Sequence, residues 1–357
     1  MDRNEEQTAS LDSFQLPNGS RPPASTGPAT LRQIMDRLDK RVASGDLGHL
    51  KSLPTGFRPL DDVLNGGLQA GELMIVGGRQ GVGKTIFGLQ MARNAAYGDN
   101  GSGALYICYE HSREHLFSRL LCLESAEQAC PAPLTLKKLN EIILREDDGL
   151  GLLERRRRSP GYGAVVDAVE GYADRLVLVK ASGDHSTMGS IRDWVEGLAS
   201  TGTERFLVVV DYLQKIPVSV GQLQPEAEVT THLAQGLKEL AMATGARIVA
   251  IAASDRPGLK SKRIQLADMR GSSALQYEAD VALMLNNKYD IVSREHLISN
   301  LSQAEQMRGW VVVTMEKNRA GRSAVDMEHA FQPAQFRFEP MGDFVRERLV
   351  DERLIRE

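Results

Sequence analysis

The sequence predicts an α/β fold in which a mostly parallel sheet is flanked by helices on both faces. Three observations predict it: short β-type runs alternate with helical stretches after residue 48, several runs are apolar throughout, and a glycine-rich turn joins the first run to a helix. Central strands that are buried on both faces have this apolar character. We expect one α/β domain over residues 49–340, preceded by a disordered tail (1–29) and a single amphipathic linker helix (30–48), and followed by a charged tail (341–357).

Composition excludes several classes of protein. The chain has 357 residues, 42% of them hydrophobic, and a net charge of −4, so it can bury a core but has no overall positive field to attract nucleic acid or anionic membranes. No apolar run approaches the ~18 residues of a membrane span, and the first residues lack a secretion signal. Its 3 cysteines form no CxxC pair, which argues against a disulfide framework or a zinc ribbon. We expect a soluble protein of the reducing cytoplasm.

The N-terminal region changes character at Thr30. Residues 1–29 are rich in Pro, Ser, Thr and acidic residues, a composition that predicts disorder. Apolar residues then follow helical spacing at Leu31, Ile34, Met35, Leu38 and Val42. Thr30 and Gln33 can form a capping box, and Gly45 suits the end of the helix. An amphipathic helix of this kind needs a surface to cover, and that surface can be its own domain or a neighbouring subunit.

The main domain is expected to contain a regular series of strands and helices. Strands are predicted at 73–76, 104–109, 176–179, 206–210, 247–252, 281–285 and 310–315. Helices are predicted at 84–97, 113–126, 190–198 and 226–244. The charged, Gly-bearing stretch 130–175 indicates peripheral helices and loops.

A phosphate-binding loop is the strongest motif in the chain. Between the strand 73–76 and the helix 84–97, the sequence matches GxxxxGK[ST] in full, with Gly78, Arg79, Gln80, Gly81, Val82, Gly83, Lys84 and Thr85. Backbone N–H groups of such a loop surround the phosphates, and the helix that follows adds its positive N-terminal dipole. We expect Lys84 to reach the β and γ phosphates of ATP and the Thr85 hydroxyl to bind Mg²⁺.

Two carboxylates are candidates for the rest of the site. Asp211 follows the apolar strand 206–210, at the end where α/β sheets bind ligands, and is expected to anchor Mg²⁺ through a water molecule. Glu110 follows the strand 104–109 and can polarise the attacking water, although its spacing alone also suits a surface loop. The segment 111–115 also fits the H-x-x-E-H pattern of some zinc peptidases, but such short patterns recur by chance, and a polar helix start is the better interpretation.

With these motifs in place, the domain resembles the RecA-like C-terminal ATPase domain of DnaB-type replicative helicases. The resemblance covers residues 53–340 and rests on three further segments: 55–73, which leads into the phosphate-binding loop, Asp211-Tyr-Leu-Gln214, which is similar to the Walker B signature, and 268–280, which is similar to the loop and helix before a late strand. The order and separations of these segments match as well as their letters.

The resemblance implies an ATP-hydrolysing homohexameric ring that uses Mg²⁺. Glu110 would be the catalytic glutamate, and the segment 316–321 would supply Arg319 as an arginine finger, with Lys317 as its companion, to the neighbouring subunit's nucleotide. The linker helix would dock on an adjacent protomer. A loader or another replication protein is a further partner class that the resemblance suggests, without naming it.

The resemblance also implies single-stranded DNA in the channel of the ring. The candidate DNA-binding residues are Arg270, Gly271, Ser272, Ser273, Lys260, Lys262 and Arg263. No aromatic residues accompany these groups, so contacts would be directed to phosphates and independent of sequence. The run of arginines at 155–158 is better interpreted as a solvated charged face.

Three departures from the family pattern bear on function. Ala253 stands where the family strand normally ends in a Gln that senses the γ-phosphate, and Gly271 follows Arg270 where an acidic residue is usual. The helicase N-terminal domain that associates with primase is missing ahead of residue 49, so we expect something other than a complete replicative helicase.

Two functions of different class follow. The first is a DnaB-like motor that acts as a ring on single-stranded DNA, which the order of the segments 55–73, 211–214 and 270–280 favours. The second is a KaiC-like or RadA-like protein that uses ATP to control assembly and partner binding without unwinding, which the absent sensor Gln and the missing N-terminal domain favour.

Overall fold

The computed structural model describes residues 27–45, 47–48, 50–98, 101–144, 149–200, 203, 205–218, 226–254, 261–292 and 301–350. The chain divides into two compact units, Met1–Leu47 and Gly48–Glu357. Most of the expected N-terminal tail, residues 1–26, lies outside the described residues, as do residues 351–357 of the expected C-terminal tail.

The first unit contains helix α1 (Leu31–Ser44), which begins and ends as its sequence predicts. The Thr30 hydroxyl accepts from the Gln33 amide at 3.2 Å, and the Gln33 side chain accepts from the Thr30 amide at 2.8 Å, so the capping box is complete. Gly45 ends the helix with φ +75°. None of the helix's residues is buried, and its apolar stripe is exposed.

The second unit is built on a 10-stranded sheet in the order β10-β8-β7-β6-β1-β5-β4-β2-β3, with β9 paired to β8. Strands β1 to β6 run parallel to one another, and β7, β8, β9 and β10 pair antiparallel with their neighbours. The strands are β1 (Leu73–Gly78), β2 (Ser102–Cys108), β3 (Leu176–Lys180), β4 (Arg205–Asp211), β5 (Arg247–Ile251), β6 (Val281–Asn287), β7 (Trp310–Asn318), β8 (Val325–Gln332), β9 (Arg337–Phe338) and β10 (Asp343–Phe344).

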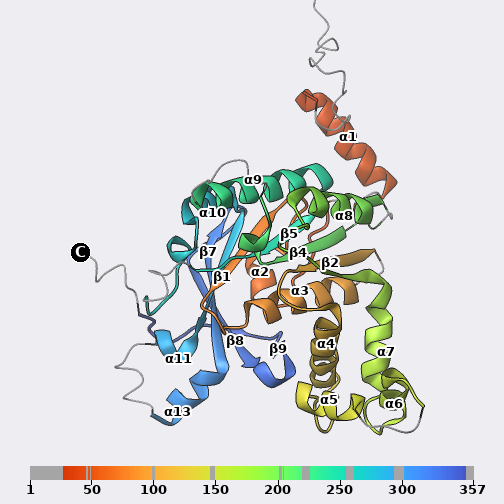
Figure 1. The fold of residues 1–357 in the computed structure, drawn as a ribbon. Helices are drawn as coiled ribbons and strands as arrows, with labels where there is room; N and C mark the ends of the chain where they lie inside the picture. The colour runs from red at the N-terminus through yellow and green to blue at the C-terminus, as the bar shows by residue number, and fades with distance from the viewer. Residues whose placement is uncertain are drawn as a thin grey trace, which may run out of the picture. The chain divides into compact units, whose positions relative to one another are not determined.

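Helices cover the two faces of this sheet (Figure 1). Alternate residues of β1 face opposite sides: Leu73 and Ile75 join a core with α8 and α9, whereas Met74 and Val76 join a core with α3, α4 and α7. The helices of the second unit are α2 (Leu60–Val63), α3 (Lys84–Tyr97), α4 (Arg113–Glu127), α5 (Leu136–Ile143), α6 (Leu152–Arg158), α7 (Gly163–Tyr172), α8 (Met188–Ser200), α9 (Glu226–Thr244), α10 (Ser272–Glu278), α11 (Lys288–Ile291) and α13 (Leu301–Gln306).

The expected elements of the main domain are confirmed, and the sheet is larger than expected. Every predicted strand and helix is present with boundaries within a few residues. The additions are the antiparallel strands β8, β9 and β10, and β10 extends the sheet beyond residue 340. Helix α7, expected to be peripheral, buries Val165, Val169 and Tyr172 in the core. Among the helices that the structure describes, none combines the length and the apolar character needed to cross a membrane.

Candidate nucleotide-binding site

The predicted site residues follow parallel strands that end together. Pairing registers place Val76, Ile251, Asp211 and Cys108 in one row across β1, β5, β4 and β2. The phosphate-binding loop and Glu110 follow directly after this row. These groups therefore gather at the C-terminal edge of the sheet, the usual ligand-binding edge of open α/β folds.

The loop between β1 and α3 requires glycine at specific points. Gly78 and Gly83 have φ of +142° and +100°. A Cβ on Gly78 would lie 2.4 Å from the Leu285 carbonyl oxygen, and one on Gly83 would lie 2.8 Å from the Phe338 ring. Within the loop, the side chains and backbone that line the cavity come from Gln80, Gly81, Gly83, Lys84 and Thr85, whereas Val82 is buried and Arg79 donates to the Ser261 carbonyl.

The Lys84 side chain folds back onto the start of this loop. Its ammonium donates to the carbonyls of Gly78 at 2.7 Å and Arg79 at 2.8 Å. Burial lowers the pKa of Lys84 to about 8, against the opposing attraction of Asp211 and Glu110. An ammonium has three donors, so one is left for a phosphate oxygen.

Asp211 is the buried carboxylate of the site. It is 1% exposed, accepts a hydrogen bond from the Tyr106 hydroxyl at 2.8 Å and also interacts with the Thr85 side chain. Burial raises the pKa of Asp211, an effect that a bound cation would oppose. The Thr85 hydroxyl and this carboxylate are hard oxygen donors that fit Mg²⁺. Among the described residues, no cluster of three or more His, Cys, Asp or Glu side chains that could hold a metal ion occurs.

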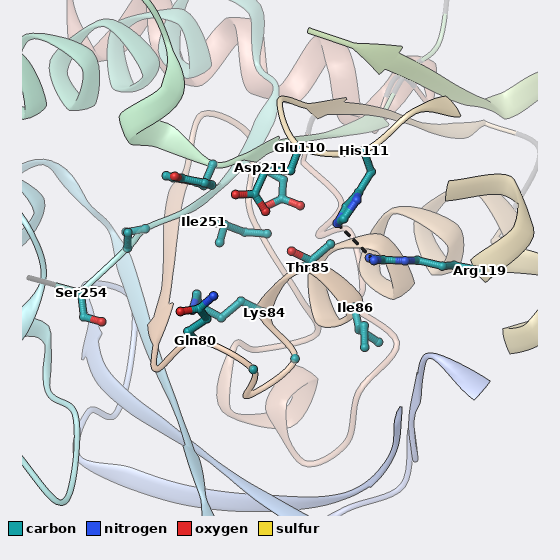
Figure 2. A pocket seen from close by; sticks show the side chains of 15 residues that line it. Gln80, Lys84, Thr85, Ile86, Glu110, His111, Arg119, Asp211, Ile251 and Ser254 are labelled. Atoms are coloured by element: carbon teal, nitrogen blue, oxygen red, sulfur yellow. Dashed lines mark hydrogen bonds between the residues drawn. The ribbon is translucent and has the colours of Figure 1, made fainter. Parts of the chain in front are cut away.

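These groups line one cavity of about 450 Å³ (Figure 2). Glu110 and Asp211 lie together, with the Thr85 side chain beside Asp211 and Lys84 beyond it. Glu110 is exposed at the cavity. The residues expected to bind phosphate, hold Mg²⁺ and orient water are therefore brought together in a single chain.

The cavity also contains residues that sequence reasoning missed. Arg119 lines it, and its guanidinium contacts the Nε2 atoms of His111 and His115, each at 3.1 Å. His115 and Arg119 are four residues apart on helix α4, a spacing that places them on one helical face and could have revealed this pair, whereas His111 lies ahead of the helix. The H-x-x-E-H segment includes the start of helix α4, with Ser112 as its N-cap, and its two imidazoles contact Arg119.

Ala253, just after β5, forms hydrogen bonds with the Walker B segment and with the segment before α10. The Ala253 amide donates to the Gln214 side chain at 3.1 Å, and its carbonyl accepts from the Arg270 amide at 3.2 Å. Gly271, the other departure from the family pattern, has φ +72°, and a Cβ there would lie 2.5 Å from Thr230. Packing against α9 therefore requires glycine at this position.

Lys317 and Arg319 lie at the opposite edge of the sheet from their own phosphate-binding loop. Asn318 pairs with Val281 at the start of β6, and Arg319 bonds Asp280 at 3.2 Å and the Tyr277 carbonyl. Lys317 donates to carbonyls at the end of α10, and burial together with the nearby Arg319 lowers its pKa. The structure does not bring these two residues into the cavity of their own chain.

The candidate DNA-binding residues have different placements. Arg270 and Gly271 are half-buried ahead of α10, Ser272 begins this helix, and Ser273 and Lys262 are exposed. Lys260 lies outside the described residues.

Arg263 differs from expectation. It is 9% exposed, and its guanidinium bonds Thr314 at 3.0 Å and forms an ion pair with Asp326. A guanidinium paired inside the domain is not available to a DNA phosphate, so the sequence-based assignment of Arg263 is corrected.

The arginine run 155–158 lies on α6 and makes local contacts. Arg157 pairs with Glu170 at 2.7 Å, and Arg158 pairs with Glu154 at 2.6 Å. Both arginine side chains are substantially exposed, as expected for a solvated charged face.

Comparison with known proteins agrees with this arrangement. The family model described as DnaB-like helicase C terminal domain matches residues 52–340. The replicative DNA helicase DnaB of Geobacillus stearothermophilus is 27% identical over 293 residues, 81% of this chain and 59% of that protein. The replicative DNA helicase DnaC of Bacillus subtilis (strain 168) is 26% identical over 292 residues, 80% of this chain and 59% of that protein. The chain thus spans less than two thirds of the length of these relatives.

Solved structures support the fold. One solved ATPase domain has a TM-score of 0.66 at 19% identity, and the match covers 87% of this chain and 99% of that one. A DnaB-like replicative helicase, solved in a study of its interactions with primase, has a TM-score of 0.64 at 19% identity, and the match covers 87% of this chain and 67% of that one. These comparisons support the DnaB-like interpretation and give no support to the alternative of an assembly switch. The chain belongs to the family of DnaB-like helicase C-terminal domains.

Proposed function

We propose that the chain is the ATP-hydrolysing part of a DnaB-like motor that acts as a ring on single-stranded DNA. The observation that carries the proposal is a division of the site between two edges of one sheet. One edge presents the phosphate-binding loop with Glu110 and Asp211, and the other presents Lys317 and Arg319. Family membership and relatives that are replicative DNA helicases support it.

Each residue of the cavity has a role that its chemistry allows. The loop amides and Lys84 would bind the phosphates of ATP, and Glu110 would accept hydrogen bonds from the attacking water and align it. Thr85 directly, and Asp211 through water, would hold Mg²⁺, which supplies neutralisation of phosphate charge when bound.

Arg319 would act on the nucleotide of the next subunit. Strand β1 has 6 residues, so at ~3.3 Å per residue its ends are about 17 Å apart. Asp280, which contacts Arg319, donates its amide to the Leu73 carbonyl at the far end of β1 from the loop. The side chain of Arg319 is 50% exposed and is thus accessible to a neighbour. A guanidinium supplied in trans makes hydrolysis depend on assembly.

Assembly would use the helix of the first unit. Helix α1 exposes Leu31, Ile34, Met35, Leu38 and Val42 along one stripe. A stable amphipathic helix needs a partner for such a stripe, and we assign it to an adjacent protomer of a homohexamer. We assign the ring to the cytoplasm.

DNA contact would involve the segment before α10. Arg270 and exposed Lys262 are the basic groups that we assign to phosphates, with Lys260 as a further candidate and backbone amides of residues 271–273 in support. The net charge of −4 leaves such a local patch as the source of affinity.

The steady-state ATPase rate with and without single-stranded DNA tests this proposal, with Lys84→Ala as the blank. We expect Lys84→Ala to abolish turnover and single-stranded DNA to stimulate the unmodified chain several-fold. Full residual activity in Lys84→Ala would refute the phosphate assignment. A rate that DNA leaves unchanged would refute the DNA motor while leaving the ATPase intact.

A further inference from the structure

His111 and Arg119 line the cavity, and His115 contacts Arg119 from behind this lining. The proposed mechanism does not use these three residues, which we call the His–Arg cluster. Arg119 Nε lies 3.1 Å from His115 Nε2, and Arg119 Nη2 lies 3.1 Å from His111 Nε2. The two imidazole centroids are 5.0 Å apart. Figure 2 shows the bond between Arg119 and His111 beside Thr85 and Ile86.

The chemistry of the cluster fixes the state of its imidazoles. A guanidinium has only donors, so both Nε2 atoms must accept, and each ring carries its proton on Nδ1. Burial, the Arg119 charge and the neighbouring His115 lower the pKa of His111 to about 4, and burial and Arg119 also lower the pKa of His115. Both imidazoles are therefore neutral near pH 7 and leave the charge of Arg119 uncancelled.

Arg119 differs from Arg93 and Arg337, two buried arginines that pair with carboxylates. Arg93 pairs with Glu124 at 2.6 Å, and Arg337 pairs with Glu127 at 2.6 Å. Within the described part of the chain, no carboxylate lies within ion-pair distance of Arg119. Burial lowers the pKa of Arg119, and the more distant Asp211 and Glu110 only partly oppose this effect. Its guanidinium also lies 5.0 Å from the Phe336 ring centroid. A half-buried cation that faces a cavity without a counter-ion suits an anionic ligand.

We propose that Arg119 binds a phosphate oxygen of the nucleotide and that His111 and His115 are positioning residues that aim its guanidinium into the cavity. The inference rests on the proposed nucleotide site. Two of the five guanidinium donors are used by the imidazoles, and others are left for the phosphate. The two histidines of the H-x-x-E-H segment thus serve phosphate binding through Arg119.

The test is equilibrium titration of the full chain with fluorescent ADP and ATP. Loss of a charge-assisted hydrogen bond predicts that Arg119→Met weakens binding by about tenfold or more. The pair His111→Leu and His115→Leu should weaken it by roughly 3- to 10-fold, because Arg119 loses its acceptors. The pair His111→Gln and His115→Gln, whose amide oxygen replaces Nε2 as acceptor, should recover affinity to within about threefold of the unmodified chain. His185→Leu, which removes an exposed histidine elsewhere, is the matched control.

Kinetics separate positioning from structural damage. The KM for ATP should rise in the Leu pair with little change in kcat, whereas general damage would lower kcat as well. Binding by Arg119→Met within twofold of the unmodified chain, while Lys84→Ala abolishes binding, would overturn this inference and leave the proposed function standing. Absence of binding by the unmodified chain would overturn the proposed function itself. If the Leu pair does not fold, the affinities of Arg119→Met and of the Gln pair for nucleotide test the inference. A Gln pair that binds nucleotide as weakly as Arg119→Met would overturn the positioning role of the histidines.

Discussion

Lys84 gives the nucleotide site a specific dependence on pH. Burial lowers the pKa of Lys84 to about 8. The side chain is therefore mostly charged below this pH and loses its charge as the pH rises above it. The phosphates of a bound nucleotide favour the protonated form of Lys84. Binding of ADP at pH 8.5 should therefore be accompanied by uptake of about half a proton or more per site. Affinity for ADP should fall as the pH rises from 8 to 9.5.

Calorimetry in two buffers of different ionisation enthalpy measures this proton uptake. Lys84→Arg is the control, because its guanidinium keeps its charge throughout this range. Equal binding enthalpies in the two buffers at pH 8.5 would show that Lys84 is already fully protonated in the empty site.

Single side chains differ in how far their roles can be predicted from sequence. Asp211 and Glu110 could be placed in one cavity because both follow parallel strands, whose carboxyl ends share an edge. The burial of Arg263 could not be predicted. Its partner Asp326 is 63 residues away and belongs to strand β8, which the sequence pattern did not predict. Tyr106, whose hydroxyl holds Asp211, lies within an apolar strand and gives no separate signal.

The loop between β1 and α3 offers a matched pair of glycines. A Cβ on Gly78 would lie 2.4 Å from backbone of β6, whereas one on Gly81 meets nothing within 4 Å, and both residues have positive φ. Gly81→Ala should cost about 1–2 kcal/mol of unfolding free energy from conformational strain alone. Gly78→Ala should cost more, because β1 must also move away from β6.

Urea unfolding of the two variants measures this difference. We expect the midpoint of Gly78→Ala to fall well below that of Gly81→Ala. Equal midpoints would mean that the β1–β6 contact is looser than the structure indicates.

Strands and helices with strong sequence patterns were predictable. The antiparallel strands at the outer side of the sheet were not. The central strands are apolar runs, and helices such as α1 carry caps that mark their ends. Strand β8 does alternate, with Met327 and His329 buried, but its inward histidine hides the pattern. The antiparallel direction of β7 depends on its pairing with β6, which no local sequence encodes.

In the proposed motor, the arrangement of the whole domain divides the catalytic site between two chains. Its parallel strands carry the loop and the carboxylates to one edge, and antiparallel β7 returns Lys317 and Arg319 to the other. One subunit can therefore offer its finger to the next while receiving another at its own cavity, the head-to-tail contact from which closed rings form. If Arg319 is the finger, as we propose, hydrolysis depends on assembly.

Complementation between two inactive variants tests this account most directly. Glu110→Gln removes the residue that aligns water, and Arg319→Ala removes the finger, so rings of either variant should be nearly inactive. In evenly mixed rings we predict about a quarter of the unmodified ATPase rate, because about one interface in four joins an intact Glu110 to an intact Arg319. Native mass spectrometry verifies that the rings are mixed. A rate in verified mixed rings no higher than that of the separate variants would contradict a site shared between subunits.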